Sequence, residues 1–236
     1  MSRRVGKKPK RKKVLPLPGS YLIATEGIQT EVLYFKSLAA ELAEKYAGLA
    51  GRIAVTIPSL TIKGTGVSNL TLIDRVAEVI QLSPTLFEHV WVVFDKDDIP
   101  LDKFDNAIKL AEQLGWHAAW SNDSFELWYL LHFEFLNTAI DREAYKDKLT
   151  QHMRSQGIQG KYEKNTTTIL PLLTAEKRQR TIRFAKKLAD YYQPTVPYHL
   201  RNPGTTVYQL VAELTDLEQR AEIARRKLTG ESATQN

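Results

Sequence analysis

Carboxylate side chains stand directly after two short apolar runs of this 236-residue chain. Glu26 follows the first run, and Asp95, Asp97 and Asp98 follow the second. Carboxylates gathered in one place repel one another, which lowers stability unless a cation joins them. Oxygen ligands without a neighbouring cysteine or histidine suit Mg²⁺ or Mn²⁺ better than Zn²⁺. These residues therefore predict a site for one or two Mg²⁺ or Mn²⁺ ions; the alternative is a loop of solvated acids.

Divalent ions held in this way are typical of phosphodiester hydrolysis, because they stabilise the charge on the phosphate and activate the attacking water. The phosphate also needs cationic donors. Residues 177–187 are rich in Lys and Arg, and on a helix Arg180, Arg183 and Lys187 would line up outward. This row is either a phosphate-contacting stripe or an ordinary solvated helix face.

A second candidate phosphate site lies in residues 199–206, directly before an amphipathic helix. The stretch contains Arg201, Asn202 and Thr205. Backbone N–H groups at a helix N-terminus bind phosphate, and an arginine adds bidentate contacts. The alternative is a helix cap with an incidental arginine.

Other polar residues have less defined roles. Lys96 lies between the acids that follow the second run, and Glu126 lies in the apolar segment 125–133; both are candidates for a supporting position at the site. Glu126 either faces the metal or pairs with a lysine or arginine. His132 is expected to be a buried, hydrogen-bonded histidine rather than a ligand, and Trp128 to belong to the core.

The elements that position these residues alternate between strand and helix. Continuous apolar runs predict strands, and apolar residues at helical spacing predict the helices between them. We expect strands at 21–24, 52–57, 89–94 and 116–120, helices over 35–46, 70–80 and 104–111, and a loop at 63–66. The alternation implies βαβ units and a mainly parallel sheet, with ligands at the carboxyl ends of the strands.

The second half of the chain has no strand-like run. We expect a buried helix at 125–133, a polar helical region over 138–192 and an amphipathic C-terminal helix over 207–228. The fold class is therefore α/β, with a mainly parallel sheet flanked by helices and a C-terminal helical region. The predicted units are a disordered tail (1–18), a catalytic core (19–136), a helical region packed on the core (137–230) and a frayed end (231–236).

The positive net charge of +6 comes from one end of the chain. Eight of the 33 Lys and Arg residues lie within residues 1–13, which leaves 25 basic and 27 acidic residues, a net charge of −2, for the rest. This tail either contacts nucleic acid or is a solvated arm. Cysteine is absent, which excludes disulfides, Cys–Zn sites and thiol nucleophiles. No apolar run could span a membrane and no signal peptide is evident, so a cytoplasmic location is expected.

Four blocks of sequence, in order, resemble the RloB-like family of bacterial restriction and phage-defence loci, whose members contain a Toprim domain. The blocks are 26–35, 93–98, 121–133 and 202–207, and the likeness covers roughly residues 19–215. The resemblance implies a Toprim, Rossmann-like core with metal-dependent phosphodiesterase activity. It also implies a role in abortive infection and an AAA/ABC-type ATPase as partner.

Carried over by position, the resemblance makes Glu26 a general base or metal ligand, and it makes Asp95 and Asp97 the Mg²⁺ ligands. Glu31 resembles the second acidic position of OLD-type nucleases, which helps to hold a second ion. The role of Asp98 stays open.

The leading hypothesis is a Mg²⁺-dependent nuclease that cuts DNA or RNA. A non-catalytic nucleic-acid-binding adaptor or sensor that uses the basic tail is the alternative, and primase-like nucleotidyl transfer is a third. Residues 63–66 lack the spacing of a phosphate-binding P-loop, so ATP hydrolysis is not expected. Spare apolar surface on the C-terminal helix is compatible with a homodimer.

Overall fold

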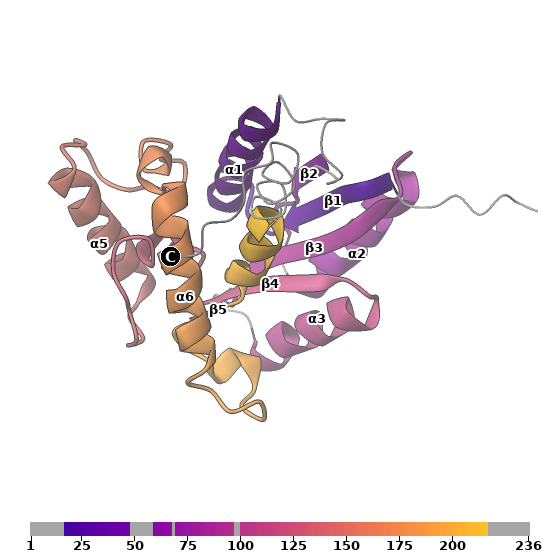
Figure 1. Cartoon of the computed structure of the whole chain (residues 1–236). Helices are drawn as coiled ribbons and strands as arrows, with labels where there is room; N and C mark the ends of the chain where they lie inside the picture. The colour runs from indigo at the N-terminus through magenta and orange to yellow at the C-terminus, as the bar shows by residue number, and fades with distance from the viewer. Residues whose placement is uncertain (1–16, 48–58, 68, 97–99, 217–236) are drawn as a thin grey trace, which may run out of the picture.

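The computed structural model describes residues 17–47, 59–67, 69–96 and 100–216 (Figure 1). Five strands form one sheet in the order β2-β1-β3-β4-β5. They are β1 (Leu17–Thr25), β2 (Ser59–Gly64), β3 (Phe87–Asp95), β4 (His117–Asn122) and β5 (Gly204–Thr205). The first four strands are parallel, and β5 is antiparallel to β4. The α/β class and the mainly parallel sheet predicted from the sequence are therefore confirmed.

Helices cover both faces of this sheet (Figure 1). Those of the first half are α1 (Thr30–Tyr46), α2 (Asn69–Leu82), α3 (Leu101–Gln113) and the short α4 (Glu126–Leu130). Those of the second half are α5 (Arg142–Ser155), α6 (Ala175–Ala189) and two 3₁₀ turns, η1 (Leu170–Leu172) and η2 (Tyr198–Leu200). Residues 207–216 are also helical. No helix in the described part of the chain is long and apolar enough to cross a bilayer.

The central strands β1 and β3 carry continuous apolar runs, at 21–24 and 90–94, because each is buried on both faces there. On β1, Leu22 and Ala24 pack with α2 and α3 in one cluster of buried residues. Their neighbours Tyr21 and Ile23 point to the opposite face and pack with α1 and the helices of the second half. Successive side chains of a strand alternate between faces, which explains how one apolar run serves two cores.

The second core joins the two halves of the chain. It contains strand residues such as Trp91 and Val93 together with Tyr145 of α5, Leu188 of α6 and Leu210 of the last described helix. The block 125–133, with Trp128 fully buried, lies at its centre. The first half and the second half of the chain therefore share one hydrophobic core.

Several predicted elements agree with the structure and a few do not. The helix expected near 104–111 is α3, and Gly115 with a φ of 74° follows its end, a conformation that glycine adopts readily. The loop expected at 63–66 was wrong in part, because Lys63 and Gly64 pair with β1 as the end of β2. The helix expected at 125–133 is shorter, since regular helix covers only α4 and turns follow it.

Some expectations fall outside the described residues. They include the strand at 52–57, the tail over 1–16, and the C-terminal chain beyond residue 216. The sequence did not predict β5, which has only two residues. Its pairing places Thr205 opposite Ser121 and Gly204 opposite Asn122, at the carboxyl end of β4.

Thr206 joins the segment that contains β5 to strand β4 by two hydrogen bonds. Its hydroxyl accepts a hydrogen bond from the Trp120 N–H (2.9 Å) and donates to the Ala118 carbonyl (3.0 Å). We expect Thr206→Val to lower the free energy of unfolding by about 1–3 kcal/mol, because valine keeps the shape and leaves both groups without that partner. Urea unfolding measures the change. Thr206→Ser keeps the hydroxyl and is the matched control; equal losses in both variants would contradict this account.

Candidate active site

The site lies where the strand order reverses. β1 has β2 on one side and β3 on the other, so the carboxyl ends of β1 and β3 flank the switch point of the sheet, where α/β proteins bind ligands. Glu26 directly follows β1, and Asp95 is the last residue of β3. The Glu26 N–H donates to the Val93 carbonyl (2.8 Å), which ties the two strand ends together. The structure thus brings both acids to one edge, as the sequence predicts.

Glu31 joins this edge from the first turn of α1. Its side chain is buried and lies against Gly27, where a Cβ atom would collide with the Glu31 carboxylate. The carboxylate accepts hydrogen bonds from its own backbone N–H and from the Gly27 N–H. A side chain at position 27 would therefore displace the Glu31 carboxylate from the backbone that holds it.

Glu126 is the first residue of α4, the short helix that follows β4 in the chain. It is 2% exposed, and the Tyr162 hydroxyl donates to its Oε1 (3.2 Å). The preceding backbone N–H, that of Phe125, donates to the Asp95 carboxylate. α4 thus supplies one acid and supports a second.

These four carboxylates, Glu26, Glu31, Asp95 and Glu126, are called the acid cluster below. Burial raises the pKa of Asp95 well above its usual range, and the charges of Glu31, Glu126 and Glu26 raise it further. Burial also raises the pKa of Glu31; its own backbone N–H opposes the shift, and Glu126 adds to it. The surroundings of Asp95 and Glu31 therefore disfavour the ionised forms of these two carboxyls.

A divalent cation fits this environment. Asp95 Oδ1 is buried and has no hydrogen-bond partner among the described residues, so one acceptor oxygen is left over. Glu26, Glu31, Asp95 and Glu126 supply only hard oxygen donors, the type that Mg²⁺ and Mn²⁺ prefer. Within the described ranges, however, no three acids or histidines converge closely enough to form a complete metal site. The predicted ligands Asp97 and Asp98 lie outside the described residues.

Further polar atoms near the ends of β4 and β5 also have unused hydrogen-bonding capacity. Asn122 Oδ1, Ser124 Oγ and Asn202 Oδ1 are buried and find no hydrogen-bond partner within the described part of the chain. Asn122 ends β4, and Asn202 stands just before β5, which pairs with that end. Asn202, predicted as a phosphate-binding residue, is therefore placed at the same sheet edge as Asp95, whose register partner on β4 is Ser121.

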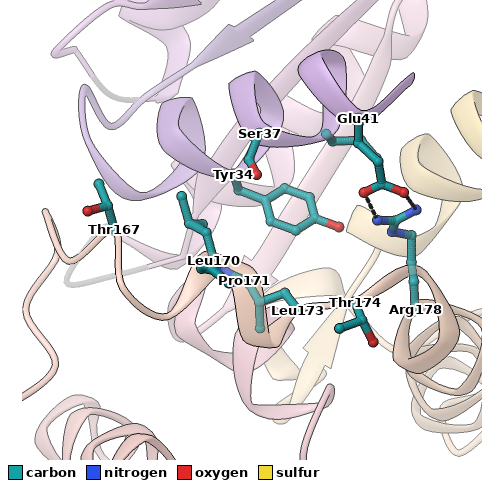
Figure 2. A pocket seen from close by; sticks show the side chains of 10 residues that line it. Tyr34, Ser37, Glu41, Thr167, Leu170, Pro171, Leu173, Thr174 and Arg178 are labelled. Atoms are coloured by element: carbon teal, nitrogen blue, oxygen red, sulfur yellow. Dashed lines mark hydrogen bonds and ion pairs between the residues drawn. The ribbon is translucent and has the colours of Figure 1, made fainter. Parts of the chain in front are cut away.

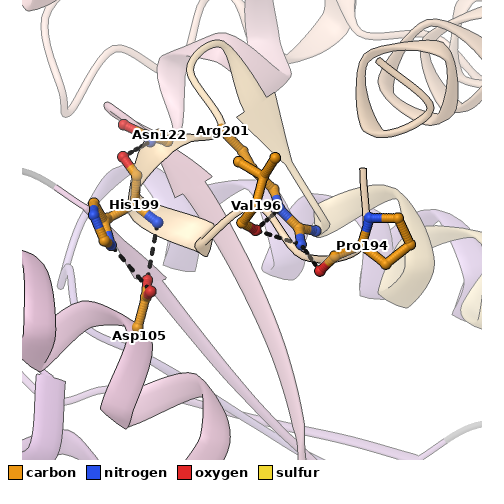
Figure 3. A network of polar contacts seen from close by, with 6 residues as sticks. All are labelled: Asp105, Asn122, Pro194, Val196, His199 and Arg201. Atoms are coloured by element: carbon orange, nitrogen blue, oxygen red, sulfur yellow. Dashed lines mark hydrogen bonds and ion pairs between the residues drawn. The ribbon is translucent and has the colours of Figure 1, made fainter. Parts of the chain in front are cut away.

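The other predicted residues of this segment hold the loop itself (Figure 3). The Arg201 guanidinium donates to the carbonyls of Val196 (2.7 Å and 2.9 Å) and Pro194 (3.1 Å). Thr205 is 2% exposed, and its hydroxyl lies 3.0 Å from that of Ser121. The Arg201 and Thr205 side chains therefore form hydrogen bonds with other residues of the fold.

An aspartate–histidine pair anchors the same loop to α3 (Figure 3). Asp105 accepts from the His199 N–H (2.9 Å), and its second oxygen lies 3.0 Å from His199 Nδ1. Asn122 Nδ2 donates to the His199 carbonyl (3.0 Å). The loop that carries Arg201 and Asn202 is therefore fixed to both α3 and β4.

In the described part of the chain, the contacts found for the basic residues predicted on α6 are with residues outside the acid cluster. Arg180 donates to the His132 carbonyl (2.9 Å), and Lys187 lies over the Phe135 ring with Nζ 4.7 Å from its centroid. Arg183 is exposed. Lys96 donates its backbone N–H to Ser121, and its side chain is half-buried.

Sequence reasoning missed two residues beside the cluster. Tyr162 bonds Glu126, and the ammonium group of Lys164 lowers the pKa of Glu31. Both lie in an irregular segment between α5 and η1, which the Lys164 carbonyl fixes to α1 by accepting from the Thr30 hydroxyl (3.0 Å). The sequence around them has no periodicity that would have identified them.

A family model described as "RloB-like protein" matches residues 21–214, which covers most of the chain. No curated protein and no solved structure matches the chain at a significant level.

Proposed function

The chain belongs to the RloB-like family, and from this premise we propose that it is a Mg²⁺- or Mn²⁺-dependent nuclease that hydrolyses phosphodiester bonds in DNA or RNA as an effector of anti-phage defence. The observation that carries the proposal is the acid cluster at the switch point of the sheet. Asp95 has its pKa raised by burial and by three neighbouring acids, which is an environment that favours a cation.

In this proposal Glu26, Asp95 and the predicted ligand Asp97 hold the ion, with Glu31 and Asp98 as further candidates. When bound, the metal polarises a phosphoryl oxygen and lowers the pKa of the attacking water. Glu126 stays in place because Tyr162 donates to it. Lys164, exposed at the rim, offers a positive charge toward the substrate phosphate. Asn202 offers its polar side chain at the same edge.

The direct test incubates the full chain with plasmid, single-stranded DNA and tRNA in Mg²⁺, Mn²⁺ or EDTA. We expect metal-dependent cleavage that Glu26→Gln abolishes. Cleavage that survives both EDTA and Glu26→Gln would place the chemistry elsewhere. We also propose an AAA/ABC-type ATPase as a partner, so the assay is repeated with a purified ATPase of that type.

Removal of residues 1–13 separates the nuclease from a tail-driven adaptor. A nuclease keeps its metal-dependent cleavage and loses mainly its rate of encounter with the polyanion. An adaptor loses most of its affinity and of its salt dependence, and it has no cleavage to keep.

The glycine after Glu26 offers a test of the geometry. We expect Gly27→Ala to lower the cleavage rate at least tenfold (about 1.4 kcal/mol in the barrier), because its Cβ would displace the Glu31 carboxylate. Steady-state cleavage assays measure the loss, and Glu31→Gln should reproduce it. If Gly27→Ala cleaves normally while Glu31→Gln does not, the contact between Gly27 and the Glu31 carboxylate has no role in catalysis.

A further inference from the structure

A hollow of about 420 Å³ lies between α1 and residues 167–178 (Figure 2). Its volume is in the range of roughly 300–1,000 Å³ that is typical of small-molecule sites. Leu38, Leu170 and Leu173 form an apolar part of its wall. No member of the acid cluster lines it, so the hollow is distinct from the proposed nuclease site.

A buried arginine stands at one end of this hollow. The Arg178 side chain is only 4% exposed, and its guanidinium donates to both carboxylate oxygens of Glu41 (3.1 Å and 2.5 Å). The Glu41 side chain is 38% exposed, so the cation is buried while its anion stands at the surface. A guanidinium taken out of water requires an anion, and its planar fork fits any carboxylate or phosphate. Glu41 is therefore the partner that can turn into solvent when another anion takes its place on this fork.

Tyr34 adds a donor beside the same arginine. The residue is 4% exposed, and Figure 2 shows its hydroxyl pointing toward the Arg178–Glu41 pair. Arg178 and Trp128 lie close enough to donate toward its oxygen, but no acceptor for its own proton lies at hydrogen-bond geometry among the described residues. Burial raises the pKa of Tyr34 to about 12, so the hydroxyl keeps its proton at neutral pH. A buried donor without an acceptor is rare in a folded protein and indicates that something else can occupy the space.

We propose that this hollow, the Arg178 pocket, binds a small molecule that carries a phosphate or carboxylate group on an apolar body. The anion replaces Glu41 on the guanidinium and accepts a hydrogen bond from the Tyr34 hydroxyl, while the apolar body lies against Leu38 and Leu170. The proposal is independent of the nuclease activity, since it uses none of the acid cluster.

The test titrates the full chain, in EDTA, with phenyl phosphate and with benzoate, and follows binding by isothermal titration calorimetry. The two probes distinguish a phosphate from a carboxylate ligand. Phenol, which lacks the anion, and inorganic phosphate, which lacks the apolar body, should each bind at least about tenfold more weakly than the better probe. Equal binding of all four compounds would overturn the proposal.

Two variants separate a binding site from a structural ion pair. Glu41→Gln removes the competing carboxylate and should tighten binding by about tenfold, whereas Arg178→Gln should weaken it by more than about tenfold. A purely structural pair predicts that Glu41→Gln lowers stability and confers no binding. If neither probe binds the wild type or Glu41→Gln, the proposal is wrong.

A third variant guards against misfolding of Arg178→Gln. Ser37 lines the hollow from an exposed position on α1, so Ser37→Trp blocks the space without disturbing the core. Binding should be lost while the far-UV circular dichroism and the melting temperature stay unchanged. Undiminished binding to Ser37→Trp would place the probe at some other site and overturn the assignment.

Discussion

Replacement of Asp95 by asparagine should abolish metal-dependent cleavage and at the same time raise the stability of the metal-free protein. The expected loss of activity is at least about 1,000-fold, because the variant removes a proposed ligand of the ion that stabilises the transition state. The gain in stability has a separate origin. Burial and the charges of Glu31, Glu126 and Glu26 raise the pKa of the Asp95 carboxyl, so its ionised form is disfavoured in the fold.

The direction of the pH dependence follows from this raised pKa. Below the ordinary pKa of an aspartate both the folded and the unfolded chain hold the proton, and the stability contributed by Asp95 is fully present. As the pH rises through the higher pKa of the folded state, the folded chain must ionise a carboxyl that the unfolded chain ionised already, and this contribution is lost. At neutral pH asparagine removes the penalty.

Thermal melts in EDTA between pH 5 and pH 8 measure the effect. Each kcal/mol gained should raise the melting temperature by roughly 2–4 °C for a chain of this size. In matched melts without EDTA, Mn²⁺ should stabilise the wild type and have little effect on Asp95→Asn, because a ligand stabilises only the state that binds it. Glu88→Gln, at the exposed opposite end of β3, is the matched control. A variant that is both active and no more stable would refute the assigned role of Asp95.

Replacement of His132 by glutamine should make the protein markedly less sensitive to acid. His132 is fully buried, and its Nδ1 lies 2.9 Å from the Trp128 carbonyl, as expected for a neutral ring that donates to that oxygen. Burial lowers the pKa of His132 to about 3, and the nearby positive charge of Arg178 acts in the same direction. The prediction that this histidine is buried and hydrogen-bonded is thus confirmed.

A lowered pKa in the folded state destabilises the protein as the pH falls. The unfolded chain takes up a proton near pH 6.5, whereas the folded chain resists until about pH 3. From pH 7.5 to pH 5 this one group should lower the free energy of unfolding by roughly 2 kcal/mol. Urea unfolding at the two pH values gives the change for wild type and His132→Gln. The exposed His117→Gln serves as control, and an equal acid sensitivity of wild type and His132→Gln would show that His132 is not responsible.

The local sequence pattern predicted those residues of the candidate site that stand at the ends of strands. Glu26 and Asp95 follow apolar runs, and parallel strands bring their carboxyl ends to one edge, so their proximity follows from topology alone. Glu126 was harder to place, because its surroundings depend on Tyr162 and on the packing of the second half of the chain. Lys164 was missed, since only its contact with α1 brings it to the cluster.

The fold shows the same division. Long apolar runs predicted β1 and β3, and helical spacing predicted α1 and α3, each of which buries one face in the core. β5 was invisible, because two residues have no periodicity and their partner strand lies more than 80 residues earlier in the chain. The end of β2 was misassigned because Lys63 and Gly64 are typical of a turn, although β1 pairs with both.

The late position of β5 has a consequence for how the protein is made. A ribosome that has finished residues 1–200 has already released the segments that form β1, β3 and β4, yet the edge of β4 still lacks its antiparallel partner. Asn202, and Thr206 with its two hydrogen bonds to β4, are translated last among the residues of this edge. A chain whose translation stops early therefore lacks part of this sheet edge. For the proposed nuclease, this order delays completion of the candidate site until most of the chain has been translated.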